Sequence, residues 1–244
     1  MPHAGDFLNT VPVKAMGLHL RKNEFTTAVK YRLGMPVYSQ EGVCTACKRE
    51  VNDVLGDHAV GCSSEGERIF RHNIIRDAIF GSAKQSSLSP TKEESALLPG
   101  NEGKPADVLI PNWFSGRDAA LDISVVSPLQ KQLVKKASEE TGSAAVKRHN
   151  DKLAKYYQRC NEEGIEFLPV VVETLGGWHP EAIFVIKKLA GQLASQTGQR
   201  TEETTRHLFQ RLSVLLARGN ATLIIHRDVN FADPSIDGDL DIDP

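Results

Sequence analysis

The fold is decided by two stretches, KPADVLI at residues 104–110 and AALDISVV at residues 119–126. Each is an apolar run typical of a buried strand, and each carries one aspartate, Asp107 in the first and Asp122 in the second, with fourteen residues between them. Burying an unpaired carboxylate costs several kcal/mol. Two carboxylates on neighbouring strands can instead share one divalent cation, so the pair predicts a Mg²⁺ site.

The bulk composition is that of a globular protein. The chain has 244 residues, of which 40% are hydrophobic and 25% charged, enough for one sizeable core or one domain with a small satellite. No apolar run approaches the length of a membrane span. The first residues have no basic cluster followed by an apolar core, so a secretory signal is not expected. We therefore expect an intracellular protein that does not bind membranes.

Acidic charge is concentrated at the C-terminal end. Residues 227–244 hold six aspartates and one arginine, a charge of −5, which leaves +3 for the remaining chain out of the overall −2. A segment of this composition cannot build a core, so we expect an acidic disordered tail. The remaining chain is mildly basic, with dense Lys and Arg between residues 131 and 159. This charge is compatible with nucleic-acid binding.

Three of the four cysteines lie in one short segment. Cys44-x2-Cys47 is followed after ten residues by His58-x3-Cys62, and four soft ligands at this spacing are typical of a tetrahedral zinc site. The segment has too few large apolar residues to form its own core, so a metal ion would order it. No open position is evident, and we expect the zinc to be structural. His72 is the alternative to His58 as the fourth ligand.

Residues 67–80 have the periodicity of an amphipathic helix that ends at Gly81-Ser82. The basic residues of this segment lie largely away from the apolar side. They form either a solvated face or a face that contacts phosphates. The candidates for nucleic-acid contact are Arg68, Arg71, His72 and Arg76, with Lys104 and Arg159 added from elsewhere in the chain.

The order of periodic segments predicts an α/β fold with a mixed central sheet flanked by helices. Strands are expected at residues 89–94, 104–110, 119–126 and 165–172, helices at 22–33, 129–163 (with a break at 141–143), 180–197 and 201–216, and a closing strand at 221–226. Pro169 inside its strand favours a bulge or a sheet edge. The predicted domains are a lead-in and helix (1–40), a zinc knuckle (41–66), the core (67–200), a C-terminal helix with its closing segment (201–226) and the tail (227–244).

A third acidic residue would complete the cation site. Glu93, which we favour over Glu94, ends the expected edge strand and would join Asp107 and Asp122 as a ligand of Mg²⁺. Such an ion would polarise a scissile phosphate and lower the pKa of an attacking water.

A lysine near that water would position it or stabilise charge in the transition state. In many metal nucleases this lysine lies two residues after the second acid, but Ser124 stands there. The candidates are then Lys152, Lys155 and Tyr156, which share one face of the helix that follows residue 143.

These motifs, taken in order, resemble the C-terminal region of non-long-terminal-repeat retrotransposon proteins. That region joins a zinc knuckle to a restriction-like endonuclease of the PD-(D/E)xK superfamily and is also similar to archaeal Holliday-junction resolvases. The resemblance spans roughly residues 5 to 220 and is carried by Cys44-x2-Cys47-x10-His58-x3-Cys62, Arg71-His72-Asn73, Lys104-Pro105-Ala106-Asp107, Asp122 and Lys152-x2-Lys155-Tyr156.

The resemblance implies a restriction-endonuclease-like α-β-β-β-α-β core and Mg²⁺-dependent nicking of DNA, which in such elements supplies the 3′ hydroxyl that primes reverse transcription. Asp107, Asp122 and Glu93 would hold the metal, and Lys152 or Lys155 would position the water. The implied partners are DNA, RNA as a second nucleic acid, and a reverse-transcriptase domain or a second copy of the chain. The implied localisation is nuclear.

Two features depart from that family. Ala106 stands where the family has proline directly before the first aspartate, and no segment resembles a polymerase domain. Two alternatives to the nicking enzyme therefore stay open. One is a catalytically inactive nucleic-acid-binding or scaffold module, and the other is a nuclease that acts on branched DNA as resolvases do.

Overall fold

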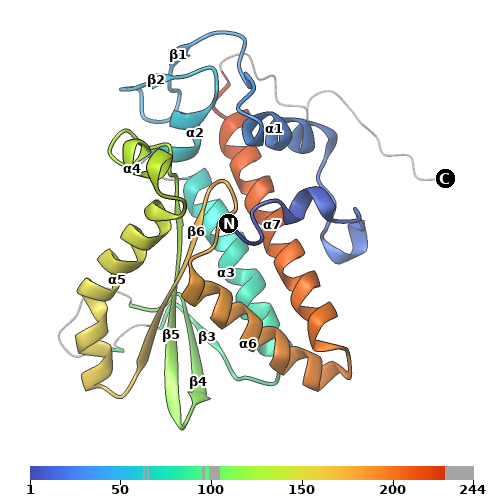
Figure 1. Ribbon diagram of the computed structural model, residues 1–244, viewed down its shortest axis with the longest axis vertical. Coiled ribbons are helices and arrows are strands. Elements are labelled where there is room, and N and C mark those ends of the chain that lie inside the picture. Colours follow the sequence, from blue (N-terminus) through green and yellow to red (C-terminus); the bar gives the residue numbers. More distant parts are fainter. Residues whose placement is uncertain (63, 65, 95–96, 99–104, 229–244) are drawn as a thin grey trace.

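The computed structural model of the chain describes residues 1–62, 64, 66–94, 97–98 and 105–228. Its centre is a four-stranded mixed sheet with helices on both faces (Figure 1). The α/β class and the flanking helices predicted from the sequence are therefore confirmed. Residues 229–244, most of the predicted tail, lie outside the described residues. The predicted nucleic-acid contact Lys104 lies outside them as well. None of the described helices is both long and apolar enough to cross a membrane.

The sheet has the strand order β3-β4-β5-β6, with bounds Thr91–Lys92, Val108–Phe114, Arg117–Val126 and Glu166–Glu173. The first three strands are antiparallel neighbours, and β6 pairs with β5 in parallel. Pro169 lies in β6 opposite Asp122. Among the described strands β6 is at the edge of the sheet, where the missing N–H of proline is tolerated, as the sequence predicted.

Alternation along β5 sends its side chains into two different cores. Leu121 and Ile123 pack with α3 (Glu67–Gln85), α6 (Pro180–Thr197) and α7 (Thr201–Ile225). Ala120, one residue out of phase, packs with α5 (Ser143–Glu162). Figure 1 shows α5 on one side of the sheet and α3, α6 and α7 on the other. Asp122 shares the parity of Ala120 and therefore belongs to the α5 face.

The helix α5 presents its buried residues as a stripe, which explains why this polar segment forms a helix against the sheet. Ala145, His149, Tyr156 and Cys160 are among its buried residues, at spacings of four or seven residues that place them on one side. A short helix, α4 (Val134–Glu139), precedes it, and the expected break falls between the two.

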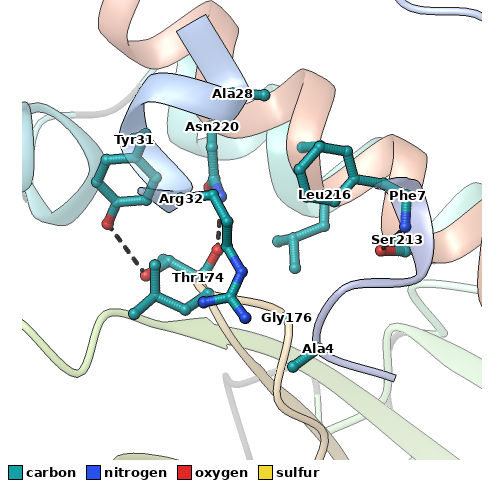
Figure 2. A pocket seen from close by; sticks show the side chains of 12 residues that line it. Ala4, Phe7, Ala28, Tyr31, Arg32, Thr174, Gly176, Ser213, Leu216 and Asn220 are labelled. Carbon is teal, nitrogen blue, oxygen red and sulfur yellow. Dashed lines mark hydrogen bonds between the residues drawn. The ribbon is translucent and has the colours of Figure 1, made fainter. Parts of the chain in front are cut away.

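Residues 1–62 pack against the C-terminal part of α7. The helix α1 (Lys22–Arg32), two short strands, β1 (Gly42–Val43) and β2 (Val51–Asn52), and the helix α2 (Asp57–Gly61) form this layer. The first residues form two 3-10 turns, Asp6–Asn9 and Lys14–Met16. A small pocket lies where the first of these turns meets α1, α7 and the turn after β6 (Figure 2). There the Thr174 carbonyl accepts a hydrogen bond from Asn220 Nδ2 at 2.7 Å.

Two helices run further than the sequence indicated. The helix α3 continues through Gly81-Ser82 to Gln85. The helix α7 continues to Ile225, so the strand expected at residues 221–226 was wrong. The helix α7 passes through Gly219, where packing requires a glycine. A Cβ at this position would meet Arg71 Cγ at 2.5 Å. The glycine makes room for a buried arginine rather than ending the helix.

Candidate functional site

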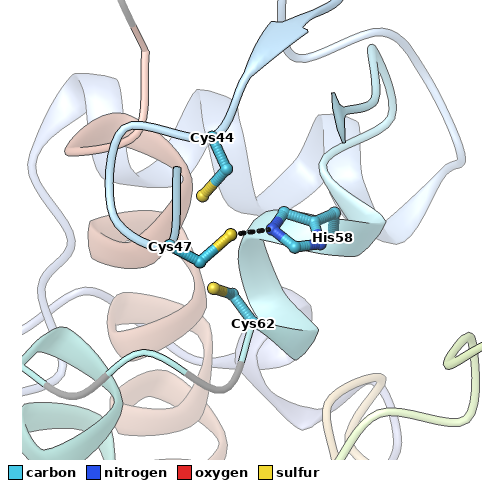
Figure 3. A group of neighbouring side chains, drawn as sticks. All are labelled: Cys44, Cys47, His58 and Cys62. Carbon is cyan, nitrogen blue, oxygen red and sulfur yellow. Dashed lines mark hydrogen bonds between the residues drawn. The ribbon is translucent and has the colours of Figure 1, made fainter. Parts of the chain in front are cut away.

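The Cys/His segment folds into a knuckle that gathers four ligands. Cys44 directly follows β1, Cys47 lies in the turn before β2, His58 is in α2, and Cys62 caps the C-terminus of α2. Their ligand atoms all lie within 4.8 Å of one another, and Figure 3 shows the three sulfurs and the imidazole pointing to a common centre. Three thiolates and an imidazole suit a tetrahedral metal ion such as zinc.

Local hydrogen bonds hold the knuckle in this shape. The Cys44 amide donates a hydrogen bond to the Glu50 carbonyl, and the Cys44 carbonyl accepts one from the Lys48 amide, each at 2.9 Å. On the other side, Asp53 Oδ2 accepts the His58 amide at 2.7 Å and so orders the first turn of α2. The ligand-bearing turn and helix are thus each ordered by hydrogen bonds that backbone amides donate.

The thiol environments differ within the knuckle. Backbone N–H groups of Arg49 and Glu50, aided by His58 Nε2 at 3.4 Å from the sulfur, lower the pKa of Cys47 to about 6. Burial raises the pKa of Cys44. A metal binds thiolate rather than thiol, so Cys47 is prepared for ligation and Cys44 depends on the ion itself.

His72 is not the fourth ligand of the knuckle. It lies on α3, and its Nε2 is 3.1 Å from Asp107 Oδ1. His58 supplies the nitrogen that joins the three cysteines, which resolves the alternative that the sequence left open.

The Asp107 carboxylate lies where β4 begins and β5 passes it. Val108 pairs with Leu121, and one residue earlier Asp107 Oδ2 accepts the Ile123 amide at 2.7 Å. The Asp107 side chain thus replaces a backbone carbonyl as the acceptor for β5, at the residue that follows Asp122. With His72 on Oδ1, both oxygens of Asp107 have donors within the protein.

Asp122 is the buried member of the pair. Its side chain is 7% exposed, and Oδ1 accepts a hydrogen bond from Lys152 Nζ at 2.6 Å. Ser124 Oγ donates to Oδ2 at 3.1 Å. Burial raises the pKa of Asp122, and the Asp107 charge adds to this rise while Lys152 opposes it. The helix lysine therefore meets the second acid, and residue 124 adds only a hydroxyl.

Glu93 does not converge with the other two acids. Its amide donates to the Asp107 carbonyl at 3.1 Å, so its backbone is in place next to Asp107. Its φ of 50° breaks the extended strand, however, and its carboxylate pairs with Arg76 on α3. Among the described residues, Glu93, Asp107 and Asp122 do not form a group whose ligand atoms all lie within 4.8 Å of one another.

The other two candidates on α5 have different surroundings from Lys152. Tyr156 is buried and packs on Phe167 with ring centroids 5.4 Å apart. The Nζ of Lys155, an exposed residue, lies 4.7 Å from the centre of the Tyr156 ring. Tyr156 is thus a core residue that supports the lysines, and Lys152 is the one that reaches an acid.

Two of the predicted nucleic-acid contacts are used inside the protein. Arg71 is buried and donates to the Val60 carbonyl at 3.2 Å and to Asn220 Oδ1 at 2.8 Å. Arg76 is buried between Asp77 and Glu93. We therefore remove both from the nucleic-acid surface. Arg68 is exposed, and Arg159 is half-buried near the C-terminus of α5.

A cationic cavity of about 200 Å³ lies between β5 and α5, the elements that carry Asp122 and Lys152. Arg68, Lys147 and Arg148 line it, and its one acid, Asp151, pairs with Lys147 at 2.9 Å. The sequence marked only Arg68 among these residues. The dense basic charge between residues 131 and 159 was the available signal for the others, but helical spacing alone could not show which of them face a cavity.

Comparison of the sequence with protein-family models and with curated proteins gives no match.

Proposed function

We propose that this protein is a Mg²⁺-dependent endonuclease that nicks DNA, built on a restriction-endonuclease-like core and stabilised by a structural zinc ion in its knuckle. The observation that carries the proposal is the contact of 2.6 Å between Lys152 Nζ and Asp122 Oδ1. An acid of the sheet and a lysine of the covering helix are thereby held together, beside a second acid on the next strand. The order α3, β3, β4, β5, α5, β6, with the short α4 before α5, supports the same core.

The donor chemistry fits Mg²⁺. Asp107 and Asp122 offer hard carboxylate oxygens, the ligands that Mg²⁺ prefers. The Asp122 carboxylate is held in a place that raises its pKa, so a nearby cation would stabilise its charged form. When bound, the ion supplies charge stabilisation at a phosphoryl oxygen and a more acidic water.

The side chains of the chain itself have separate tasks in this proposal. Lys152, partly exposed at 19% and anchored on Asp122, orients the attacking water and stabilises charge on the phosphate. His72 and the Ile123 amide fix the Asp107 carboxylate from two directions. Fixed acceptors of this kind lower the reorganisation needed when substrate binds.

The cationic cavity gives the substrate class. Arg68, Lys147 and Arg148 line a space next to the strand that carries Asp122 and the helix that carries Lys152, and clustered basic side chains bind the phosphate backbone independently of sequence. DNA is the polymer that we propose to lie there, with RNA as the competing nucleic acid in the test.

The deciding experiment compares Asp122→Asn with the parent on supercoiled plasmid in Mg²⁺. Nicking should fall at least ~100-fold, the order of loss when one transition-state-stabilising group is removed, while DNA affinity and folding stay close to those of the parent. Asp118→Asn, on the same strand but bonded to the Asn112 amide at 2.9 Å, is the matched control. Equal nicking by the Asp122 variant would remove this residue from the mechanism.

One observation favours a second candidate, an inactive nucleic-acid-binding module. All four carboxylate oxygens of Asp107 and Asp122 already have donors within the protein. A parent protein that binds DNA but does not nick it in Mg²⁺ would establish that candidate. Offering a four-way junction beside the plasmid separates the resolvase alternative, which predicts preference for the junction.

A further inference from the structure

A second group of metal-ligating side chains lies away from the knuckle and does not include Asp107 or Asp122. His149 comes from the middle of α5, and His179 and Glu181 come from the start of α6. One ligand atom from each of the three lies within 4.8 Å of the others. Residues from two helices that the chain connects through β6 are thus brought to one point.

The contacts within the group favour a shared ligand. The His149 and His179 rings stack with centroids 3.8 Å apart and 17° between their planes. His149 Nε2 contacts Glu181 Oε2, and His149 Nδ1 lies 3.4 Å from Asn150 Oδ1. A metal-binding histidine typically has such a partner on its other nitrogen, which fixes the ring orientation. The group also has a route from solvent, because the Glu181 side chain is 34% exposed while that of His149 is 9% exposed.

We propose that His149, His179 and Glu181 bind a divalent transition-metal ion of the zinc class. Two imidazoles and one carboxylate match the ligand set of zinc sites that keep an open fourth position. The same nitrogen ligands disfavour Mg²⁺, which prefers oxygen. The site is independent of the proposed nuclease centre, because it shares no ligand with it.

Binding the ion changes two existing contacts. The hydrogen bond between His149 and Glu181 is replaced by two coordinate bonds. Coordination through His179 Nδ1 would also give up the cap of α6, in which that nitrogen accepts the Glu181 amide at 3.3 Å. A cap of this kind is worth about fivefold in the helix equilibrium, which is small against the affinity of three zinc ligands.

The ion would clamp α5 to the start of α6. Lys152 lies one turn along α5 from His149, on the same helix that covers Asp122. A clamp at this point restrains the helix that presents the lysine. Its effect on metal content and on melting can be measured without any nuclease assay.

Zinc analysis of the full chain tests the proposal, after equilibration with Zn²⁺ and removal of unbound metal. The parent should retain two equivalents per chain, one of them at the knuckle. His179→Asn removes the ring but keeps a side chain that caps helices well, and Glu181→Gln keeps an acceptor for His149. Each variant should retain one equivalent and lose the part of the Zn²⁺-induced rise in melting temperature that the second ion supplies.

Two controls make the count decisive. Asp122→Asn should still hold two equivalents, which excludes zinc bound at the acidic pair. His207→Asn, which changes a half-buried histidine on α7, should also hold two. The knuckle zinc reports that each variant is folded. A parent that holds one equivalent overturns the proposal, as do His179→Asn and Glu181→Gln variants that both hold two.

Discussion

The knuckle and the acidic pair are the two cation sites of our proposal, but their donor atoms are engaged to different degrees. In the knuckle, three sulfurs and a nitrogen converge within 4.8 Å, and Cys47 Sγ lies 3.4 Å from His58 Nε2, so ligand atoms contact one another. In the pair, each oxygen of Asp107 and Asp122 has a donor from elsewhere in the protein. The ligand atoms of the knuckle therefore face one another, whereas the carboxylates of the pair are bonded to other groups of the protein.

The difference teaches how tightly each cation should bind. A zinc ion would complete the knuckle and order a segment with little core of its own, so its binding energy would be folding energy. A Mg²⁺ ion at the pair must compete with the Lys152 ammonium for Asp122. Tight, structural zinc and weak, exchangeable magnesium follow from the same principle, the number of contacts that the ion replaces.

The largest effect is expected from breaking the knuckle. Cys47→Ser should abolish zinc retention at the knuckle and lower the melting temperature, because structural zinc contributes about 10–16 kcal/mol to binding in small zinc domains. Metal analysis and thermal unfolding with and without a chelator measure both. The knuckle packs on α7 through Val60 and Ile224, so part of the loss should spread to that helix.

The matched control is Cys160→Ala, which removes the buried cysteine that packs beside Tyr156 and belongs to no metal-ligating group of the described chain. It should retain the knuckle zinc. If Cys47→Ser melts like the parent, the ion is not structural and the contrast between the two sites disappears.

A smaller effect is expected from removing the cation of the acidic pair. Lys152→Met keeps the length of the side chain but leaves buried Asp122 without its ion-pair partner, a loss of about 3 kcal/mol at neutral pH. Burial raises the pKa of Asp122 and Lys152 opposes that rise, so removal of the lysine raises the pKa further. The loss of stability should therefore be small when the Asp122 carboxyl is protonated in both proteins. It should grow as pH rises from the folded-state pKa of the parent towards that of the variant.

Thermal unfolding across pH, with and without Mg²⁺, measures this. Added Mg²⁺ should restore part of the stability of Lys152→Met because the ion replaces the missing positive charge, while nicking should stay low. Lys155→Met is the control, since Lys155 lies over the Tyr156 ring instead of an acid. Equal destabilisation by both variants would show that the Asp122 contact has no special weight.

Sequence periodicity was enough for the layers of this fold but not for its ends. The pattern of apolar residues predicted α1, β5, the α4–α5 break, β6 and α6, and the first residues of β4, because each contributes a local run of apolar residues to the core. It did not predict that α3 passes Gly81 or that α7 passes Gly219. Those outcomes depend on a packed neighbour, Arg71 in the case of Gly219, which only the tertiary structure brings there.

The candidate sites show the same division. Ligand spacing identified the Cys44 to Cys62 knuckle because a short loop can bring its own ligands together. The basic residues of α3 could not be separated by spacing: Arg68 stays at the surface, while Arg71 is drawn into a hydrogen bond with Asn220 on α7. The group of His149, His179 and Glu181 combines two helices, and no local pattern links its members.

The smallest effect is expected from Glu93→Gln, which tests whether Glu93 acts with Asp107 and Asp122 as a third acid. The Glu93 carboxylate pairs with Arg76 rather than facing Asp122. Its side chain is 45% exposed, so the ion pair should contribute under about 1 kcal/mol. Nicking and the Mg²⁺ concentration for half-maximal rate should change less than ~10-fold, far below the loss in Asp122→Asn. A Glu93→Gln loss as large as that of Asp122→Asn would mean that substrate or Mg²⁺ turns Glu93 away from Arg76 into a three-acid site.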